Sequence, residues 1–564
     1  MKSHEFLGPI QMKSMHKKQR SSRRDAKSHS APHPMKHKEA ERGRNRKENL
    51  KGFSFALSSR LCDFACAFIF WFRFARDRNF AEAFFTVFSG IALTTSFLFA
   101  QTPDRSAPPK LGPPASLQLP PIHHFKLSNG LPVVLMEKSQ VPLVQINLLI
   151  RAGSAMESAD KTGLASLTAD ILDKGAGKRD ALQLADAVDF LGANLSAGAS
   201  QHTSVISLNT PLARLDSALT LFADVALRPT FSNAELERLR KERLTTLLQW
   251  HDRPSSIASV LFNRTIFSDN HPYGRPSLGN EKSLRALSTA DLKNFHGKYF
   301  LSNNATLIVV GAVDVSSVQG KLEKAFGSWR TGDMVTSTWP GVKQVEKRQI
   351  YLADKPGAAQ TEIRIGRIGV PRKTEYYYAI TVMNTILGGS FTSRLNQNLR
   401  EQHGYSYGAG SSFSFRPLPG PFVASAAVQT DATDKALTEF MKELNRILEP
   451  VSDDELSRGK NYVALGYPSE FQSVGQIAGN LQELVTYDLP DDYFNNYMGR
   501  ILAVTKEDVQ RVAKKYIDPE KVAIILVGDR AKIEKGVRAL NLGTMQLLTI
   551  EQVLGKAPKL EGTN

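Results

Sequence analysis

The stretch Ala305-Thr306-Leu307-Ile308-Val309-Val310-Gly311 has a counterpart 217 residues later, Val522-Ala523-Ile524-Ile525-Leu526-Val527-Gly528. The segment before each stretch repeats at the same offset, so that 287–299 corresponds to 504–516. In both segments the apolar residues are spaced by three and four, and an all-apolar run ending in glycine follows. This pattern predicts an amphipathic helix followed by a buried strand. A repeat with a constant offset indicates that the body of the chain is an internal duplication.

The duplication sets the expected domain organisation. Two strands joined by a polar turn are expected at 132–136 and 143–150, and the second copy is expected to begin with strands at 348–352 and 362–368 and a helix at 376–387. Strands clustered beside long helices favour an α+β fold over a doubly wound parallel sheet. We therefore expect two homologous α/β-sandwich domains at 122–326 and 348–545, with a linker at 327–347 and a tail at 546–564.

The first 121 residues differ from this body in composition. Residues 1–78 form a basic, low-complexity extension, and its part at 1–51 contains too little apolar surface to fold. Within 79–100, an uncharged run of 18 residues predicts a signal peptide, with an uncleaved membrane anchor as the alternative. Residues 101–121 contain seven prolines and are expected to be an extended linker. Because a signal peptide does not begin with such an extension, we hypothesise that the true start codon lies near 73–87 and that the residues before it are mistranslated.

The charge of the chain is concentrated near its beginning. The formal net charge is +17, and residues 1–100 carry 19 Lys and Arg against 8 Asp and Glu, which leaves +6 for residues 101–564. A body this mildly basic argues against nucleic acid as a partner. The only two cysteines, Cys62 and Cys66, precede the body, which therefore has neither a disulfide framework nor a thiolate metal site.

The segment Gly163-Leu164-Ala165-Ser166-Leu167-Thr168-Ala169-Asp170 resembles an active-site helix of the insulinase or pitrilysin family of zinc peptidases, close to its mitochondrial-processing-peptidase branch. In that family the helix reads G-L-A-H-x-x-E-H, with two zinc-binding histidines and a glutamate as general base. The resemblance spans roughly 122–541. Its other signatures are Arg151-Ala152-Gly153-Ser154, His271-Pro272-Tyr273-Gly274-Arg275-Pro276 with Gly279, and Leu387-Gly388-Gly389-Ser390-Phe391-Thr392-Ser393-Arg394-Leu395.

The resemblance implies that the zinc chemistry has been lost. Ser166, Ala169 and Asp170 stand where the family has His, Glu and His. The family's third ligand, a Glu, lies on a later helix that we place at 235–250, where Thr246 occupies the expected position and a shifted register would bring in Glu242 instead. A catalytic zinc needs about three protein ligands. We therefore expect no metal in this chain and no peptide hydrolysis by it alone.

Two residues of the second copy match a substrate-contacting pair of the family. Arg400 and Tyr407, in Arg400-Glu401-Gln402-His403-Gly404-Tyr405-Ser406-Tyr407, align with an Arg and a Tyr that contact substrate beside the zinc. An Arg can hold a carbonyl or carboxylate, and a phenol can donate to an oxygen on which negative charge develops. In two-chain members of the family the zinc-free chain supplies this pair to its partner. The alternative is that Arg400 is a solvated helix-end residue and that Tyr407 fills a strand.

Other polar residues are interpreted as structural. Gly388 and Gly389 are expected to form a tight turn at a helix end, with contact to peptide as a further role. Asp170 and Asp173 are expected to lie on a solvated helix face. Four histidines of the body, His202, His271, His296 and His403, are scattered without metal-ligand spacing between them and are also interpreted as structural.

The resemblance thus implies a non-catalytic, substrate-binding subunit of an exported, heterodimeric insulinase-type zinc peptidase. Such a chain would form half of a chamber around unfolded peptides, and its partner would carry H-x-x-E-H and the zinc. We expect a periplasmic or otherwise exported protein that contacts a membrane only through an N-terminal anchor. The alternative is a peptide-binding or structural protein of this fold without a peptidase partner. A self-sufficient metallopeptidase is disfavoured because both His positions are changed.

Overall fold

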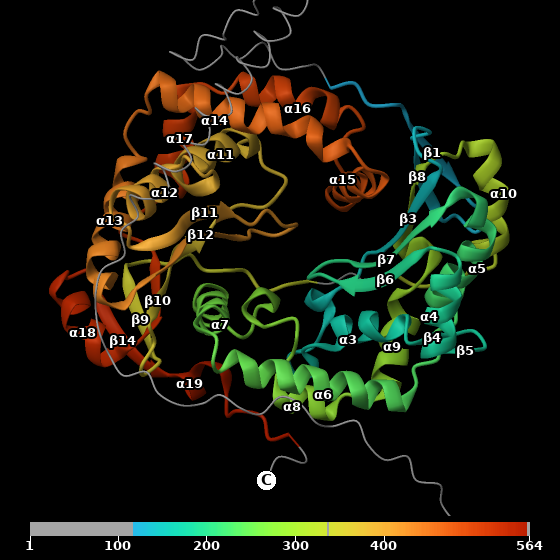
Figure 1. Ribbon diagram of the computed structural model, residues 1–564, viewed down its shortest axis with the longest axis horizontal. Helices are drawn as coiled ribbons and strands as arrows, with labels where there is room; N and C mark the ends of the chain where they lie inside the picture. Colours follow the sequence, from blue (N-terminus) through green and yellow to red (C-terminus); the bar gives the residue numbers. More distant parts are fainter. Residues whose placement is uncertain (1–116, 335–337, 561–564) are drawn as a thin grey trace, which may run out of the picture. The chain divides into compact units, whose positions relative to one another are not determined.

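The structure, a computed structural model, describes residues 117–334 and 338–560 (Figure 1). The expected extension at 1–78, the apolar segment at 79–100 and most of the linker at 101–121 lie outside the described residues. All the described residues belong to one compact unit. Within the described part, no helix is both long and apolar enough to cross a membrane.

Each copy of the duplication contains a six-stranded mixed sheet. In the first sheet, β8 runs parallel to β2 and antiparallel to β3, and the other neighbours are antiparallel. Its order is β1 (Ile122–Lys126), β2 (Pro132–Glu137), β8 (Ala305–Gly311), β3 (Leu143–Ile150), β7 (Ser204–Pro211) and β6 (Asn194–Ala199). The two strands expected at 132–136 and 143–150 are therefore present but are not neighbours, because the fully buried repeat strand β8 lies between them.

The second sheet repeats this order. From one edge it reads β11 (Ser406–Phe413), β12 (Pro421–Gln429), β10 (Gln360–Ile368), β13 (Ala523–Gly528), β9 (Gln349–Asp354) and β14 (Thr544–Thr549). The run β6-β7-β3-β8-β2 matches β11-β12-β10-β13-β9, with the second repeat strand, β13, again parallel to one neighbour and antiparallel to the other. The α+β fold expected from the sequence is confirmed, and the topology agrees with the duplication.

The helices follow the same correspondence. Those of the first copy are α3 (Leu164–Leu172), α4 (Ala181–Phe190), α5 (Leu215–Leu227), α6 (Asn233–Trp250), α7 (Pro254–Phe267), α8 (Glu281–Ala286), α9 (Thr289–Tyr299) and α10 (Val315–Phe326). Those of the second are α11 (Tyr377–Asn384), α12 (Arg394–Asn396), α13 (Thr433–Arg446), α14 (Asp453–Gly466), α15 (Val474–Tyr487), α16 (Tyr493–Leu502), α17 (Lys506–Tyr516), α18 (Arg530–Ala539) and α19 (Ile550–Leu554). A short hairpin of β4 (Gly175–Ala176) and β5 (Arg179–Asp180) precedes α4.

Two boundaries differ from the sequence expectations. The helix expected at 376–387 is α11 followed by a π-helical turn at Thr385–Gly389. Strand β14 crosses the boundary expected at 545/546 and pairs with β9. Part of the segment expected to be a tail thus completes the second sheet.

The glycine that ends each repeat strand is required by close packing. A Cβ on Gly311 would stand 2.4 Å from the carbonyl oxygen of Leu143, and one on Gly528 would stand 2.6 Å from Oγ1 of Thr361. Both distances are shorter than a van der Waals contact. In both copies the close atom belongs to the neighbouring antiparallel strand, β3 or β10, so close packing against the equivalent strand requires glycine in both.

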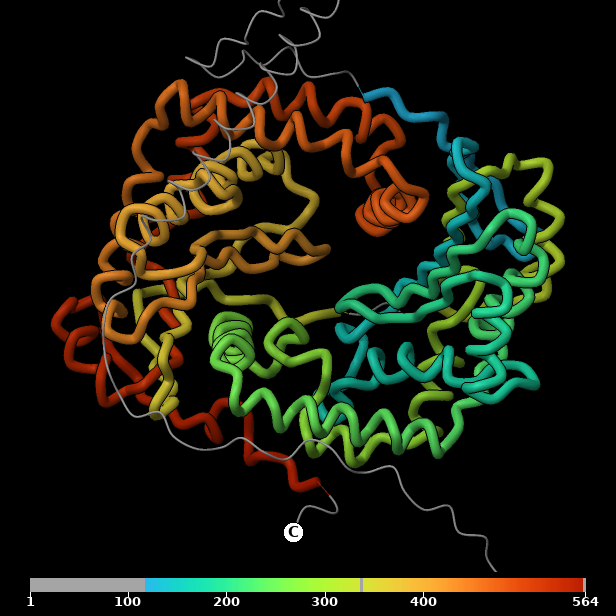
Figure 2. Tube along the Cα trace, in the orientation of Figure 1, coloured from blue at the N-terminus to red at the C-terminus, as the bar shows by residue number. Residues whose placement is uncertain are grey.

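The two copies exchange one helix each. Helix α7 of the first copy packs on β10 and β13 of the second sheet, and α15 of the second copy packs on β3 and β8 of the first. Figures 1 and 2 show α7 beside the second sheet and α15 beside the first. Phe262 and Ile525 belong to one buried apolar cluster, and Ile477 and Ile308 belong to another. Each sheet therefore depends on the other copy to bury one of its faces.

Candidate functional site

Helix α3 carries the residues that replace the family's zinc motif, and its first turn is held by a buried carboxylate. The Glu157 carboxylate accepts hydrogen bonds from the backbone N–H groups of Gly163, at 3.0 Å, and Ala165, at 2.6 Å. Burial raises the pKa of Glu157 to about 7, although these N–H groups and the nearby Arg275 and Arg243 act in the opposite direction. Gly163 precedes the helix with φ of 92°, in the left-handed region that favours glycine.

The guanidinium of Arg243, from α6, joins the two positions at which the family has histidines. Its Nη2 lies 2.6 Å from Oδ2 of Asp170, and its Nη1 donates to Oγ of Ser166 at 2.9 Å. Nη1 also donates to the carbonyl oxygen of Leu278 at 3.2 Å. The Arg243 residue is only 5% exposed. Asp170 is thus the partner of a buried cation and not simply part of a solvated helix face, whereas Asp173 pairs with Lys174.

These residues do not fit a zinc ion. A serine hydroxyl and one carboxylate remain near the family's ligand positions, both engaged by a guanidinium, and the small apolar Ala169 stands at the position of the general base. A second cation beside Arg243 would be repelled by it. Within residues 117–334 and 338–560, no group of three or more His, Cys, Asp or Glu side chains could hold a metal ion.

Neither residue expected at the third ligand position lies against Ser166 and Asp170. The Thr246 hydroxyl bonds to the carbonyl of Glu242 one turn earlier, and the exposed Glu242 carboxylate pairs with Arg238 at 2.5 Å. Arg243, which our sequence reading missed, instead lies against Ser166 and Asp170. It stands one helical turn before Thr246, on the same helix as the position expected for the third ligand.

Arg400 and Tyr407 lie in the second copy, at the edge of its sheet. The Arg400 guanidinium covers the ring of Phe391 at 4.6 Å and lies 3.4 Å from the Glu401 carboxylate. Tyr407, on edge strand β11, is 92% exposed, so it does not fill the strand's core face. Neither side chain bonds to Ser166, Asp170 or Arg243 among the described residues.

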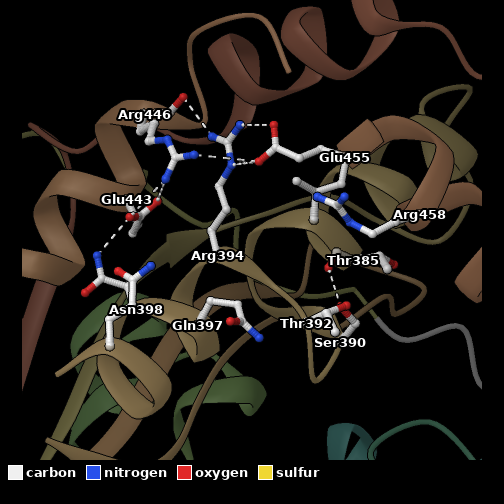
Figure 3. A pocket seen from close by; sticks show the side chains of 13 residues that line it. Thr385, Ser390, Thr392, Arg394, Gln397, Asn398, Glu443, Arg446, Glu455 and Arg458 are labelled. Carbon is white, nitrogen blue, oxygen red and sulfur yellow. Dashed lines mark hydrogen bonds and ion pairs between the residues drawn. The ribbon is translucent and has the colours of Figure 1, made fainter. Parts of the chain in front are cut away.

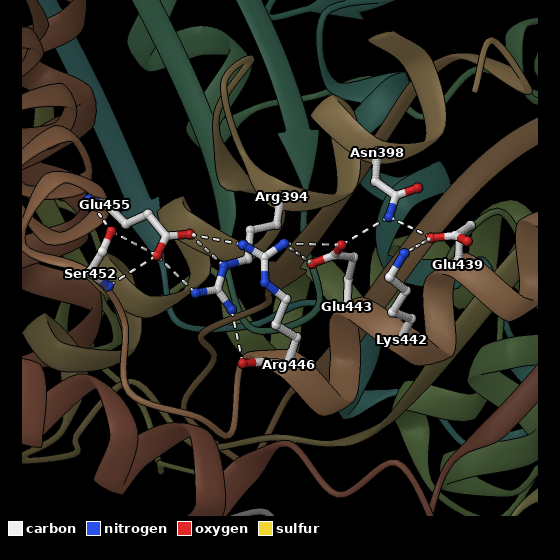
Figure 4. A network of polar contacts seen from close by, with 8 residues as sticks. All are labelled: Arg394, Asn398, Glu439, Lys442, Glu443, Arg446, Ser452 and Glu455. Carbon is white, nitrogen blue, oxygen red and sulfur yellow. Dashed lines mark hydrogen bonds and ion pairs between the residues drawn. The ribbon is translucent and has the colours of Figure 1, made fainter. Parts of the chain in front are cut away.

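A buried ionic network fixes the segment that carries Arg400. Arg394 forms a two-pronged ion pair with Glu455, at 2.7 and 3.0 Å, and donates to the carbonyl of Arg446 (Figure 3). Arg446 pairs with the buried Glu443, which also accepts from Asn398 (Figure 4). A small cavity of about 210 Å³ lies beside these residues. Hydrogen bonding to Arg394 lowers the pKa of Glu455 to about 2.

The network ties Arg394 and Asn398 of the Arg394–Gln402 segment to α13 and α14, and therefore acts as the anchor of this segment. Gly388, expected in a tight turn, has a packing role as well: a Cβ there would lie 2.2 Å from the backbone nitrogen of Ser411 on β11.

Two family models match the chain. One, described as insulinase (peptidase family M16), matches residues 133–279, and the other, described as the peptidase M16 inactive domain, matches residues 286–463. The chain belongs to the insulinase family. The first range contains Ser166, Asp170 and Arg243, and the second contains Arg400 and Tyr407, so both groups of candidate residues lie in matched segments.

Relatives and solved structures agree with this membership. An uncharacterised zinc protease of Rickettsia felis is 26% identical over 410 residues, which cover 72% of this chain and 91% of that protein. The structure titled as a peptidase M16 inactive domain, from Pseudomonas fluorescens, has a TM-score of 0.68 and 26% identity, and covers 72% of this chain and 98% of that one. The periplasmic protease PqqL of Escherichia coli has a TM-score of 0.62 and 16% identity over 78% of this chain, which spans 50% of PqqL.

Four histidines that the sequence singled out occupy structural positions in this insulinase-family chain. His202 and His271 both contact the ring of Tyr273. His296 bonds to the carbonyl of Ala226, and His403 stacks on Tyr405.

Proposed function

We propose that the chain is a non-catalytic, substrate-binding subunit of a two-chain insulinase-type zinc metallopeptidase. The observation that carries this proposal is the bonding of Arg243 to Ser166 and Asp170. A guanidinium remains protonated at all physiological pH values and has no lone pair to offer as a base. It cannot replace either a metal-bound water or the family's glutamate in attack on a peptide bond.

Arg400 and Tyr407 supply the contribution of this subunit to the reaction. The phenol of Tyr407 is free to meet a second molecule because it is almost fully exposed and has no bonding partner among the described side chains. In the complex, Tyr407 donates to the carbonyl oxygen of the bond being cleaved, and Arg400 binds the peptide. The resemblance to a structure titled as an inactive domain supports the division of roles between two chains.

An edge strand offers a place for the peptide itself. Strand β6 packs beside α3, and β7 is its sole strand neighbour among the described strands. An extended peptide can add to such an edge through main-chain hydrogen bonds, which favours unfolded over folded substrates. The zinc and the H-x-x-E-H motif belong to the partner, and the two chains enclose the peptide. The apolar segment at 79–100 supports export to the periplasm, as a signal peptide or an anchor.

The test is reconstitution with the partner. The tagged full chain is recovered from its native cells, its partner is identified by mass spectrometry, and zinc is measured in the complex and in each chain. We expect zinc in the partner alone. Replacing Arg400 with Ala or Tyr407 with Phe should lower peptide turnover by about tenfold to a thousandfold while association is retained.

Matched controls are Tyr462→Phe and Arg458→Gln, both at exposed positions of α14. The controls should keep wild-type turnover. If Tyr407→Phe and Arg400→Ala also kept wild-type turnover, the proposal that these two residues act on the substrate beside the partner's zinc would be wrong. If the chain associated with no H-x-x-E-H protein, the alternative of a peptide-binding or structural protein without a peptidase partner would replace it.

A further inference from the structure

A cavity of about 440 Å³ lies between the two copies of the duplication, away from α3. The first copy contributes the turn between β6 and β7, including His202. The second contributes Arg416, from the loop that joins β11 to β12, and the last turns of α15, including Glu483 and Tyr487. A ligand in this cavity would therefore contact both copies at once.

Arg416 is held rigidly at the wall of this cavity. Its backbone pairs with Pro371, and its carbonyl accepts from the N–H of Arg372 at 2.7 Å. The Tyr487 hydroxyl donates to the neighbouring carbonyl of Phe415 at 3.1 Å. The guanidinium covers the ring of Tyr273 at 4.6 Å. The position of the charge is thus fixed before any ligand arrives.

The positive charge of Arg416 has no counter-charge in the described part of the chain. Its guanidinium forms neither a hydrogen bond nor an ion pair there, and Nη1 is buried without a partner. The one carboxylate that lines the cavity, Glu483, is bonded to Arg372 at 3.0 Å. His202 adds no negative charge. Burial, and then Arg416 itself, lower its pKa to about 4, so it is neutral near pH 7.

A partly buried, unpaired guanidinium is unfavourable because its buried Nη1 has lost water without gaining an acceptor. Burial lowers the pKa of Arg416 accordingly. An anion in the cavity would remove this penalty and accept from the planar guanidinium through two oxygens. A single uncompensated positive charge matches a monoanion better than a dianionic phosphate, and the amides of Gln201 and Gln482 line the same cavity and can donate to it.

We propose that this cavity binds a carboxylate of a peptide and that Arg416 is the residue that recognises it. The proposal rests on the peptide-binding part of the proposed function but not on a zinc partner. It makes the cavity a second peptide contact, separate from Arg400 and Tyr407, that holds a terminal or acidic residue between the two copies.

The proposal is tested by calorimetric titration of the full chain at pH 7 with three acetylated tripeptides. One is trialanine with a free terminal carboxylate, one is trialanine amide, and one is an amide that contains a single Glu. We expect saturable binding of at least one carboxylate peptide and none of trialanine amide. Comparison of the two carboxylate peptides distinguishes a terminal from a side-chain carboxylate.

Variants of Arg416 test whether this residue binds the carboxylate. Arg416→Gln should weaken binding of the carboxylate peptide at least about tenfold, because the charge-assisted pair is lost. It should also raise the melting temperature of the ligand-free chain, because an unpaired buried charge is removed. Arg458→Gln, which removes an exposed arginine, should change neither. Should Arg416→Gln fail to fold, Arg416→Lys, which keeps the charge but lacks the two-pronged geometry, should still weaken binding.

The proposal is overturned if no carboxylate peptide binds, if trialanine amide binds as well as trialanine, or if the folded Arg416 variant binds like wild type. Binding of inorganic phosphate without binding of either carboxylate peptide would also overturn it. A reconstituted peptidase that depends on Tyr407 while no carboxylate peptide binds the isolated chain would refute this inference alone and leave the proposed function standing.

Discussion

Arg243 places a permanent positive charge where the insulinase family gathers ligands around a metal ion. The cation is supplied by the chain itself and is compensated by Asp170, with Ser166 and a backbone carbonyl as further acceptors. Asp170 stays partly solvated, with 43% of its side chain exposed, so the ion pair is buried on one side only. Such a pair holds α3 against α6 without any metal.

This arrangement predicts that restoring the motif will not be enough to restore zinc binding. In a chain carrying Ser166→His, Ala169→Glu, Asp170→His and Thr246→Glu, the retained Arg243 should oppose Zn²⁺ by charge repulsion. Adding Arg243→Ala should raise zinc affinity at least about tenfold, which corresponds to about 1.4 kcal/mol. Affinity is measured by competition with a chromophoric chelator. The matched control adds Arg238→Ala on the exposed face of the same helix, and equal zinc affinity with and without Arg243 would contradict the prediction.

At the scale of single elements, the start of α3 depends on Glu157. Helix N-termini leave backbone N–H groups without partners. Here one buried carboxylate satisfies two of them, at Gly163 and Ala165, and so joins the loop before the helix to its first turn. The position of Ser166 and Asp170 therefore depends on an acidic residue that lies outside the helix, in the loop before it.

The raised pKa of Glu157 gives this element a defined pH dependence. The ordinary pKa of 4.5 applies to the unfolded chain, and burial raises the pKa to about 7 in the folded chain. Between these values the folded chain binds the proton more tightly. Proton binding by Glu157 therefore stabilises the folded chain fully below about pH 4.5. This stabilisation, on the order of 3 kcal/mol, is lost as the pH rises to about 7.

Urea unfolding of wild type and Glu157→Gln between pH 4.5 and 7.5 checks this. Gln should remove the decline attributed to Glu157, because an amide does not titrate in this range. A decline of the same size in Glu157→Gln would show that another group titrates.

At the scale of the whole molecule, the exchange of α7 and α15 joins the two copies. Each helix belongs to one copy by sequence and to the core of the other by packing. The cavity beside Arg416 and the placement of α15 along its wall follow from this exchange, because α15 reaches the first sheet only by crossing between the copies. A substitution that destabilises one copy should therefore destabilise the other copy as well.

Phe262→Ala in α7 tests this coupling. The Phe262 ring packs against Gly366 of β10, and its removal should cost about 3 to 5 kcal/mol. Hydrogen exchange should accelerate in β10 and β13 of the second sheet as well as in α7. Ser255→Ala, on the exposed side of α7, is the control and should leave exchange unchanged. Acceleration confined to the first copy would mean that the copies fold independently.

The sequence alone determined the fold class, the duplication and its repeat strands, because apolar periodicity and the terminal glycines reflect local packing that both copies share. Through the resemblance, it also indicated the loss of the two histidines and the glutamate of the zinc motif, since those three positions are defined by residue type and spacing within one helix. The role of Arg243 was decided by the tertiary structure, because a long side chain can reach across from another helix and its sequence position does not reveal its target. The same holds for the unpaired charge of Arg416 and for the exchange of α7 and α15. Those features depend on which distant segments pack against each other in the folded chain, and a local sequence pattern contains no information about such contacts.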